Sequence, residues 1–276
     1  MRDDDVEAVH ELSVVTFADY ERRHHEPPSP MPAPHAGHVR LRHLLDTDPG
    51  GCWVADDGTL AGAAIALVRE GISGLSLLIV RPELQSAGLG RALLERALDY
   101  GDGARGGIIL SSGDARALRA YAAAGFALHP TVKAVGAPRG AVADPSVRPF
   151  TAADLPMAAS VDRAVRGAAH GSDLDALAAA GCELLAHPGR GYAAHRDGAV
   201  KLLAAADEEA AAALLRTVLA RVPATKHAEV EWITSRQQWA VEVALETRLE
   251  LRPQSAVFLR GEVGPLTPYL PAGADR

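Results

Sequence analysis

The sequence predicts an α/β protein in which a mixed, largely antiparallel twisted sheet flanked by helices is used twice. The chain has 276 residues, which is a usual length for two domains. Apolar runs with strand periodicity alternate with runs of helical periodicity along it. The order of these runs in residues 1–136 recurs in residues 147–276, after a segment of glycine, proline and small polar residues at 137–146. We therefore expect two tandem domains joined by a linker.

The first half is expected to contain an antiparallel meander followed by two helix–strand units. Two turn signals, Asp57-Gly58 and Glu70-Gly71, join three apolar runs, which are therefore expected to form neighbouring antiparallel strands. Residues 24–38 are rich in proline and are expected to form a surface loop. In order, the expected elements are helices at 4–23 and 39–45, strands at 52–56, 60–69 and 72–80, a helix at 90–100, a strand at 108–111, a helix at 114–124 and a strand at 126–135.

The second half repeats this plan with a difference at its start. A strand at 147–150 precedes its first helix, whereas the first half begins directly with a helix. Further along, residues 191–198 resemble residues 51–58, and residues 235–249 resemble residues 112–126. We expect the second copy to be a diverged form of the fold and the first copy to be truncated at its first strand.

Composition and charge argue against several classes of protein. The net charge of −7 and the pI of about 5.9 are atypical of proteins that bind nucleic acids or anionic membranes. The two cysteines, Cys52 and Cys182, lie far apart, which argues against a disulfide framework and a thiolate zinc site. No apolar run is long enough to span a bilayer, and the first residues lack the features of a secretory signal. We therefore expect a cytoplasmic protein without nucleic-acid or membrane partners.

One short segment carries the strongest functional signal. It lies between an apolar strand and an apolar-faced helix, and it contains small residues and two glycines. The first turn of a helix exposes unpaired N–H groups and the positive end of the helix dipole, and glycine allows a phosphate to approach the backbone. Arg91 can add a charge-assisted contact. We expect an anion-binding loop made of Gln85, Ser86, Ala87, Gly88, Leu89, Gly90 and Arg91.

Two common phosphate-binding motifs do not fit this loop. A P-loop requires the pattern GxxxxGK[ST], and no such string occurs in the chain. A dinucleotide-binding fingerprint requires GxGxxG at the start of a parallel βαβ unit, whereas here a single GxG follows an antiparallel meander. A nucleotide-binding oxidoreductase is therefore the weaker interpretation.

Two motifs resemble those of the GNAT superfamily of acyl-CoA-dependent N-acyltransferases. The pyrophosphate loop of that family reads V-x-P and then Q/R-x-x-G-x-G/A, and Val80-Arg81-Pro82 with residues 85–90 (QSAGLG) match every position. The second motif is a strand, Asn or Asp, and a helix that ends in Tyr-x-x-x-Gly-Phe. Asp114 and residues 121–126 (YAAAGF) match it. Both motifs occur in the expected order within residues 1–136.

The resemblance implies direct transfer of an acetyl group from acetyl-CoA, the co-substrate, to a primary amine. In the family, a backbone N–H of the fourth strand polarises the thioester carbonyl, a role that maps onto Leu78, Ile79 and Val80. Tyr121 matches the general acid that meets the leaving thiolate, and the ordinary pKa values of tyrosine and a thiol, roughly 10 and 8.5, are close. Asp114 stands where the family often has an Asn that contacts CoA, and we expect it to cap its helix.

The resemblance does not identify a general base. Family members often use a Glu on the fourth or fifth strand, where this chain has Gly74 and Ile109. Glu70, at a hairpin tip, is expected to face solvent. The serines that can hold a water molecule instead are Ser76, Ser111 and Ser112.

Histidines gather around the Pro-rich loop. The region that carries them contains no cysteine and no HExxH motif. We therefore expect neither zinc nor another metal there. One of these histidines can contact the acceptor or act as a base. The residues are His24, His25, His35, His38 and His43.

The second half lacks both motifs. Residues 204–210 (AAADEEA) stand where the loop belongs, without glycine and with three acidic residues that would repel a pyrophosphate. Ala244 stands where Tyr121 stands in the first half. We therefore expect the second half not to bind CoA, and instead to pack against the first domain and help form the wall of the acceptor pocket.

Two functions remain open at this stage. The first is an N-acetyltransferase whose acceptor is a small-molecule or peptide amine, such as a polyamine, an aminoglycoside-like compound, an amino acid or a protein N-terminus. The alternative is a non-catalytic CoA- or acyl-CoA-binding sensor or interaction protein, which the missing strand-borne carboxylate favours. A homodimer is compatible with either function.

Overall fold

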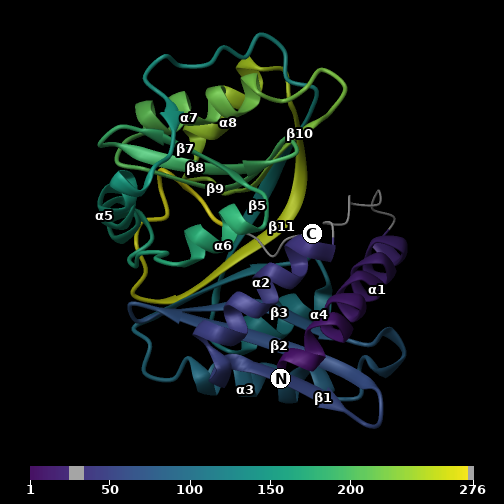
Figure 1. The fold of residues 1–276 in the computed structure, drawn as a ribbon. Coiled ribbons are helices and arrows are strands. Elements are labelled where there is room, and N and C mark those ends of the chain that lie inside the picture. The colour runs from purple at the N-terminus through teal and green to yellow at the C-terminus, as the bar shows by residue number, and fades with distance from the viewer. Residues whose placement is uncertain (25–33, 273–276) are drawn as a thin grey trace. The chain divides into compact units, whose positions relative to one another are not determined.

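The computed structural model describes residues 1–24 and 34–272, which form two compact units (Figure 1). The first unit comprises Met1–Ile109, and the second begins at Leu110. Each contains a sheet with helices packed on it, so the predicted α/β class is confirmed. None of the described helices is both long and apolar enough to cross a membrane.

The first unit contains the predicted antiparallel meander. Strands β1 (Cys52–Asp56), β2 (Leu60–Arg69) and β3 (Ile72–Val80) have the predicted bounds and pair in sequence order. Strand β4 (Gly106–Ser111) pairs with β3 in parallel. The glycine-containing turns determine this arrangement because they end one apolar run and start the next within three residues and two residues, respectively.

Helices cover both faces of this sheet. On one face, α1 (Val6–His24) and α2 (Pro34–Thr47) pack against alternate residues of β2 and β3. On the other face, α3 (Leu89–Tyr100) packs against the residues between them. This explains the continuous apolar run of β2, because a strand that is covered on both faces has no solvent-facing side.

Helix α2 differs from the expected helix at 39–45. It begins at Pro34, five residues earlier, within the segment expected to be a loop. Proline is tolerated in the first turn of a helix because the N–H it lacks would have no partner there. The rest of the Pro-rich segment, residues 25–33, lies outside the described residues.

The second unit contains the remaining elements. Its sheet has the strand order β11-β5-β10-β9-β8-β7-β6, and β12 pairs with β9. Figure 1 shows α7 and α8 next to each other on this sheet, where their apolar side chains form the main core. The elements are α4 (Ala115–Ala123), β5 (Ala127–Gly136), β6 (Arg148–Pro149), α5 (Leu155–Val165), α6 (Asp173–Ala179), β7 (Glu183–His187), β8 (Gly191–Arg196), β9 (Ala199–Ala205), α7 (Glu208–Ala220), β10 (Ala228–Ile233), α8 (Gln238–Glu246), β11 (Glu250–Gly261) and β12 (Tyr269–Leu270).

Strand β5 comes from the first half of the sequence but lies between two strands of the second half. It pairs antiparallel with β10 on one side, from Ala228↔Gly136, and with β11 on the other, from Glu250↔Val135 to Leu259↔Ala127. The compact units therefore divide the chain before α4, while the expected division into 1–136, a linker at 137–146 and 147–276 follows the sequence repeat. The bounds 1–136, 137–146 and 147–276 therefore stay a prediction of where the repeated units begin and end in the sequence.

Candidate functional site

Strand β3 separates from β4 partway along its length. The parallel pairing between them runs from Ile72↔Gly106 to Leu75↔Ile109 and ends there. On the other side of β3, the register with β2 shifts between Leu75 and Leu77, so that Ser76 is a bulged residue without a partner in β2. A bulge bends a strand and redirects its backbone groups. Beyond it, β2 is the only strand paired with β3 among residues 1–24 and 34–272.

The residues proposed to polarise a carbonyl lie beyond this bulge. Leu78, Ile79 and Val80 pair with Ala64, Ala63 and Gly62 of β2. Ile79 and Val80 are buried, and Leu78 is half-buried. The backbone groups on the β4 side of β3 therefore have no strand partner in β4 from the bulge to the end of the strand.

Arg40 of α2 holds the bulge in place. Its guanidinium donates a hydrogen bond of 2.7 Å to the carbonyl of Ser76, and it also contacts the Ser76 hydroxyl. Sequence analysis did not predict this contact, because Arg40 belongs to no motif and its partner is 36 residues away. The sequence signal is a serine, Ser76, within the apolar run from Leu75 to Val80. The hydroxyl that was expected to hold a water molecule is thus bonded to a cation.

The other candidates for a base do not supply a titratable group at the separation of the strands. Gly74 and Ile109 lie in the last paired stretch of β3 and β4, and Ile109 is buried. Glu70 is exposed in the turn between β2 and β3, as expected. The geometry therefore leaves the general base unassigned.

The loop after β3 is held against the strand that precedes it. A short 3-10 turn, Pro82–Leu84, follows β3, and the Gln85 side chain returns to donate a hydrogen bond of 3.0 Å to the Val80 carbonyl. Ser86 and Gly88 then adopt left-handed backbone conformations, with φ of 69° and 93°. A Cβ atom on Gly88 would meet no atom within 4 Å, so the loop is open to solvent at that point.

Five consecutive amides of this loop have no hydrogen-bond partner among the described residues. They are the backbone N–H groups of Ser86, Ala87, Gly88, Leu89 and Gly90. The next amide, that of Arg91, donates to the Gly88 carbonyl and starts the helical pattern of α3. These free donors stand at the positive end of a 12-residue helix, so the loop is suited to bind an anion.

Arg91 adds a movable positive charge beside the loop. Its side chain is largely exposed and donates a hydrogen bond of 2.8 Å to Glu95, one turn along α3. An exposed pair of this kind contributes only a few tenths of a kcal/mol. The guanidinium can therefore leave Glu95 for a more highly charged ligand at little cost.

Tyr121 and Asp114 belong to the second unit. The Asp114 carboxylate accepts a hydrogen bond of 2.8 Å from the Arg116 amide, which confirms its predicted role as the cap of α4. Tyr121 is buried, and its ring packs edge-on against Phe258 with 5.5 Å between ring centroids. Burial, and to a lesser degree the Asp114 charge, raise the pKa of Tyr121 far above its ordinary value. Its hydroxyl is therefore a hydrogen-bond donor that gives up its proton less readily than an ordinary tyrosine.

The corresponding helix of the second half begins differently. At the start of α7, the Asp207 carboxylate accepts a hydrogen bond of 2.9 Å from the Ala210 amide, and Arg190 binds both Asp207 and Glu209. This helix end is thus occupied by a carboxylate of the chain itself. Ala244, the counterpart of Tyr121, is buried in the core.

The histidines do not assemble a metal site in the part of the chain that the structure describes. No group of three or more His, Cys, Asp or Glu side chains is placed to hold an ion there. The His24 ring contacts the Tyr20 carbonyl at 2.9 Å, and His38 lies edge-on to His10 with 5.0 Å between ring centroids. His25 lies outside the described residues.

Comparison with known proteins shows which family the first part of the chain resembles. Residues 11–126 match the Acetyltransferase (GNAT) family, which confirms the resemblance seen in the two motifs. The family match supports acyl transfer in general, and proteins of this family typically bind acetyl-CoA as a co-substrate. No curated protein matches the chain.

Solved structures share the fold over the whole chain. A candidate acetyltransferase from Pyrococcus horikoshii has a TM-score of 0.80 at 16% identity, covering 99% of this chain and 92% of its own. A GCN5-related N-acetyltransferase from Sphaerobacter thermophilus has a TM-score of 0.55 at 14% identity, covering 100% and 96%. A tandem GNAT protein from the clavulanic acid biosynthesis pathway has a TM-score of 0.55 at 14% identity, covering 94% and 96%. The predicted tandem GNAT-like fold is thereby confirmed.

Proposed function

We propose that this protein is an N-acetyltransferase that moves an acetyl group from acetyl-CoA directly to a primary amine. The observation that carries the proposal is the row of five free amides at residues 86–90, placed at the positive end of α3 where β3 has separated from β4. A diphosphate can accept several hydrogen bonds from such a row, and a neutral ligand would gain much less. Arg91 would add a charge-assisted contact, and Gln85 would keep the loop in place.

The chemistry proposed for the transfer is a direct displacement. The amine nitrogen forms a bond to the thioester carbonyl carbon, the carbon–sulfur bond breaks, and the thiolate leaves with the electron pair. A backbone N–H of β3, in the stretch from Leu78 to Val80, would stabilise the negative charge that develops on the carbonyl oxygen. Holding both substrates together supplies much of the remaining rate enhancement.

Tyr121 is proposed to donate a hydrogen bond to the leaving thiolate. Its raised pKa keeps the hydroxyl protonated over the whole range in which amines and thiols titrate. The amine must lose one proton in the reaction, and water or a histidine near α1 and α2 would accept it. The proposed acceptor is a small-molecule or peptide amine, and the second half is proposed not to bind CoA because Asp207 and Arg190 occupy the start of α7.

A non-catalytic CoA-binding sensor is the second candidate. It is favoured by one observation, namely that Gly74 and Ile109 stand where a strand-borne carboxylate would act as base. The two candidates share the cofactor loop and differ in turnover. A CoA-binding assay alone therefore does not separate them.

The test combines binding with turnover and uses a matched pair of glycine variants. Gly88 and Gly58 both have positive φ, and a Cβ on either would meet no atom within 4 Å, so Gly88→Trp and Gly58→Trp carry similar backbone strain. Acetyl-CoA at about a hundred times its Kd should stabilise the parent and Gly58→Trp by about 2.7 kcal/mol. It should not stabilise Gly88→Trp, because the indole fills the path of the diphosphate.

Turnover is measured as thiol release from acetyl-CoA with a panel of amines. Amine-dependent release by the parent and by Gly58→Trp, but not by Gly88→Trp, is the result expected of an acetyltransferase. Stabilisation without release on any amine would establish the sensor instead. Equal stabilisation of both variants would contradict the placement of the cofactor loop.

A further inference from the structure

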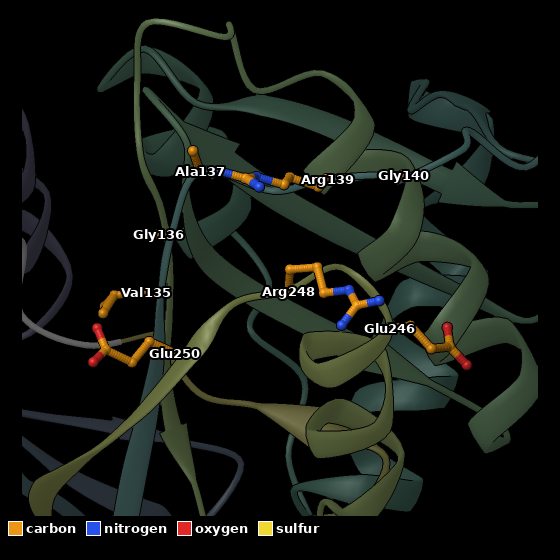
Figure 2. A pocket seen from close by; sticks show the side chains of 8 residues that line it. All are labelled: Val135, Gly136, Ala137, Arg139, Gly140, Glu246, Arg248 and Glu250. Carbon is orange, nitrogen blue, oxygen red and sulfur yellow. The ribbon is translucent and has the colours of Figure 1, made fainter.

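An open hollow in the second unit is used by nothing in the proposed acyl transfer. Its volume is about 810 Å³, which lies in the range of small-molecule sites. The end of β5, the segment after it, the end of α8 and the start of β11 form its walls (Figure 2). The residues that line it are Val135, Gly136, Ala137, Arg139, Gly140, Glu246, Arg248 and Glu250.

Two of the four charged side chains that line this hollow, both arginines, have no ion-pair partner among the described residues. The Glu246 carboxylate accepts hydrogen bonds of 2.9 and 2.8 Å from Arg216, and the Glu250 carboxylate accepts bonds of 3.1 and 2.5 Å from Arg252. The Arg139 and Arg248 guanidinium groups, by contrast, have no partner in the part of the chain that the structure describes. Figure 2 shows both guanidinium groups in the middle of the view and the two carboxylates toward its opposite sides.

Arg248 occupies a backbone position that ordinarily requires glycine. It follows the end of α8 with a φ of 63°, the Arg248 amide donates to the Leu245 carbonyl, and the Leu249 amide donates to the Ala244 carbonyl at 2.8 Å. This is the Schellman closure of a helix, in which the residue with positive φ is usually glycine because a side chain is strained there.

Two other helices of the same unit end with this closure and do use glycine. Gly125 follows α4 with a φ of 84°, and Gly181 follows α6 with a φ of 90°. Gly125 is the counterpart of Arg248 in the sequence repeat. The closure at the end of α8 therefore does not require an arginine. Because the backbone of Arg248 is strained, its presence there points to a role for its side chain.

The end of a helix carries a partial negative charge, which would oppose an anion at this place. Here three of the last four carbonyls of α8 already accept hydrogen bonds. The carbonyls of Val243, Ala244 and Leu245 accept amides of the chain, and the Thr247 carbonyl accepts the Arg139 amide at 2.8 Å. That last bond also ties the segment that carries Arg139 to the helix end that carries Arg248, and both arginines line the hollow.

We propose that this hollow binds a phosphate-bearing small molecule, whose phosphate is held by Arg139 and Arg248. A phosphate dianion neutralises both unpaired charges, and each planar guanidinium can donate two parallel hydrogen bonds to its oxygens. The volume exceeds what a bare phosphate needs, so an organic group can occupy the remainder beside Val135 and Ala137. The site is separate from the loop at residues 85–91 and does not depend on the proposed acyl transfer.

The experiment titrates inorganic pyrophosphate into the full chain that carries Gly88→Trp, so that the first anion-binding loop does not contribute. Calorimetry should detect binding in this background. Arg139→Ala and Arg248→Gly should each weaken it by about tenfold or more, since each removes a charge-assisted contact. Arg119→Ala, which removes an exposed arginine of α4 in the same unit, should leave the affinity unchanged.

A stability measurement separates loss of a binding group from damage to the fold. Arg248→Gly should melt at or above the temperature of its parent in the absence of ligand, because glycine relieves the strained φ. Undiminished binding when Arg139→Ala and Arg248→Gly are combined would overturn the proposal, as would no binding at millimolar pyrophosphate. A failure of acetyl-CoA to stabilise the unmodified chain would contradict the proposed function and leave this site intact.

Discussion

Tyr121 combines a buried ring with a hydroxyl whose proton is held tightly. Phe258 packs against the ring edge-on, and burial raises the pKa of the hydroxyl far above its ordinary value. The ordinary pKa values of tyrosine and a thiol are close, so the sequence alone predicts that proton transfer from Tyr121 to a thiolate costs little free energy. The burial of this side chain shifts the balance toward a donated hydrogen bond, because the tyrosinate would be poorly solvated.

Replacing Tyr121 with phenylalanine tests this role. Tyr121→Phe keeps the ring and its contact with Phe258, so the fold should persist. The turnover number should fall by about tenfold to a hundredfold, since a single hydrogen bond to the leaving group is lost. The Kd for acetyl-CoA, measured by calorimetry, should change little. Unchanged turnover would remove Tyr121 from the mechanism.

Individual residues differ in how well the sequence predicts them. Gln85 and Gly88 belong to a motif with fixed spacing, and Asp114 is a familiar helix cap, so their positions follow from local signals. Arg40 and Arg248 belong to no motif. Arg40 acquires its meaning from Ser76, far away along the chain, and Arg248 from its left-handed backbone. Neither a tertiary contact nor a strained φ at a non-glycine residue leaves a trace in periodicity or spacing.

Helix starts distinguish the two halves at the scale of elements. Helix α3 begins with amides that have no partner in the described structure, whereas α7 begins with the Asp207 carboxylate bound to the Ala210 amide. Arg190 neutralises that carboxylate. The same helical element therefore attracts an anion in the first half and is already satisfied in the second half.

The segment before α5 provides a pH-dependent test of stability. The Asp154 carboxylate accepts two hydrogen bonds of 2.7 Å from Arg148 and one of 2.8 Å from the Thr151 amide. The Arg148 contacts hold the pKa of this carboxyl well below its usual range. A carboxyl with a depressed pKa in the folded state stabilises the fold above its unfolded pKa of roughly 4, and this contribution is lost as the pH falls.

Asp154→Asn should therefore lower the free energy of unfolding at pH 7 by about 1–3 kcal/mol. The difference from the parent should be smaller at about pH 2 than at pH 7, because below about pH 4 the unfolded carboxyl is already protonated while the folded one still holds its charge, so the stabilisation decreases steadily towards the depressed folded pKa. Denaturant unfolding at the two pH values measures both quantities, and Asp102→Asn, in an exposed turn, serves as the control. A difference that stays constant with pH would contradict this assignment.

Element bounds were predicted best where glycine or helix caps mark them. The bounds of β1, β2 and β3 are as predicted because Asp57-Gly58 and Glu70-Gly71 separate them. The start of α2 was wrong, because proline density indicates a loop unless the proline occupies the first helical turn, as Pro34 does.

At the scale of the whole molecule, the sequence repeat and the compact units divide the chain at different places. The repeat is visible as a recurring order of elements, but strand β5 of the first half pairs with β10 and β11 of the second half. Pairing partners depend on tertiary packing, and a strand has the same periodicity whichever sheet it joins. The tandem fold could therefore be predicted from the sequence, whereas the pairing of β5 could not.

Hydrogen exchange of the full chain, followed amide by amide with and without saturating acetyl-CoA, tests the central claim most directly. The claim predicts slower exchange at the amides of residues 86–90 in the complex, and no change at residues 206–210 before and within the first turn of α7. Free, exposed amides exchange fast, so the protection should be large and confined to the first of the two segments. Unaltered exchange at residues 86–90, or protection at 206–210 instead, would contradict the account.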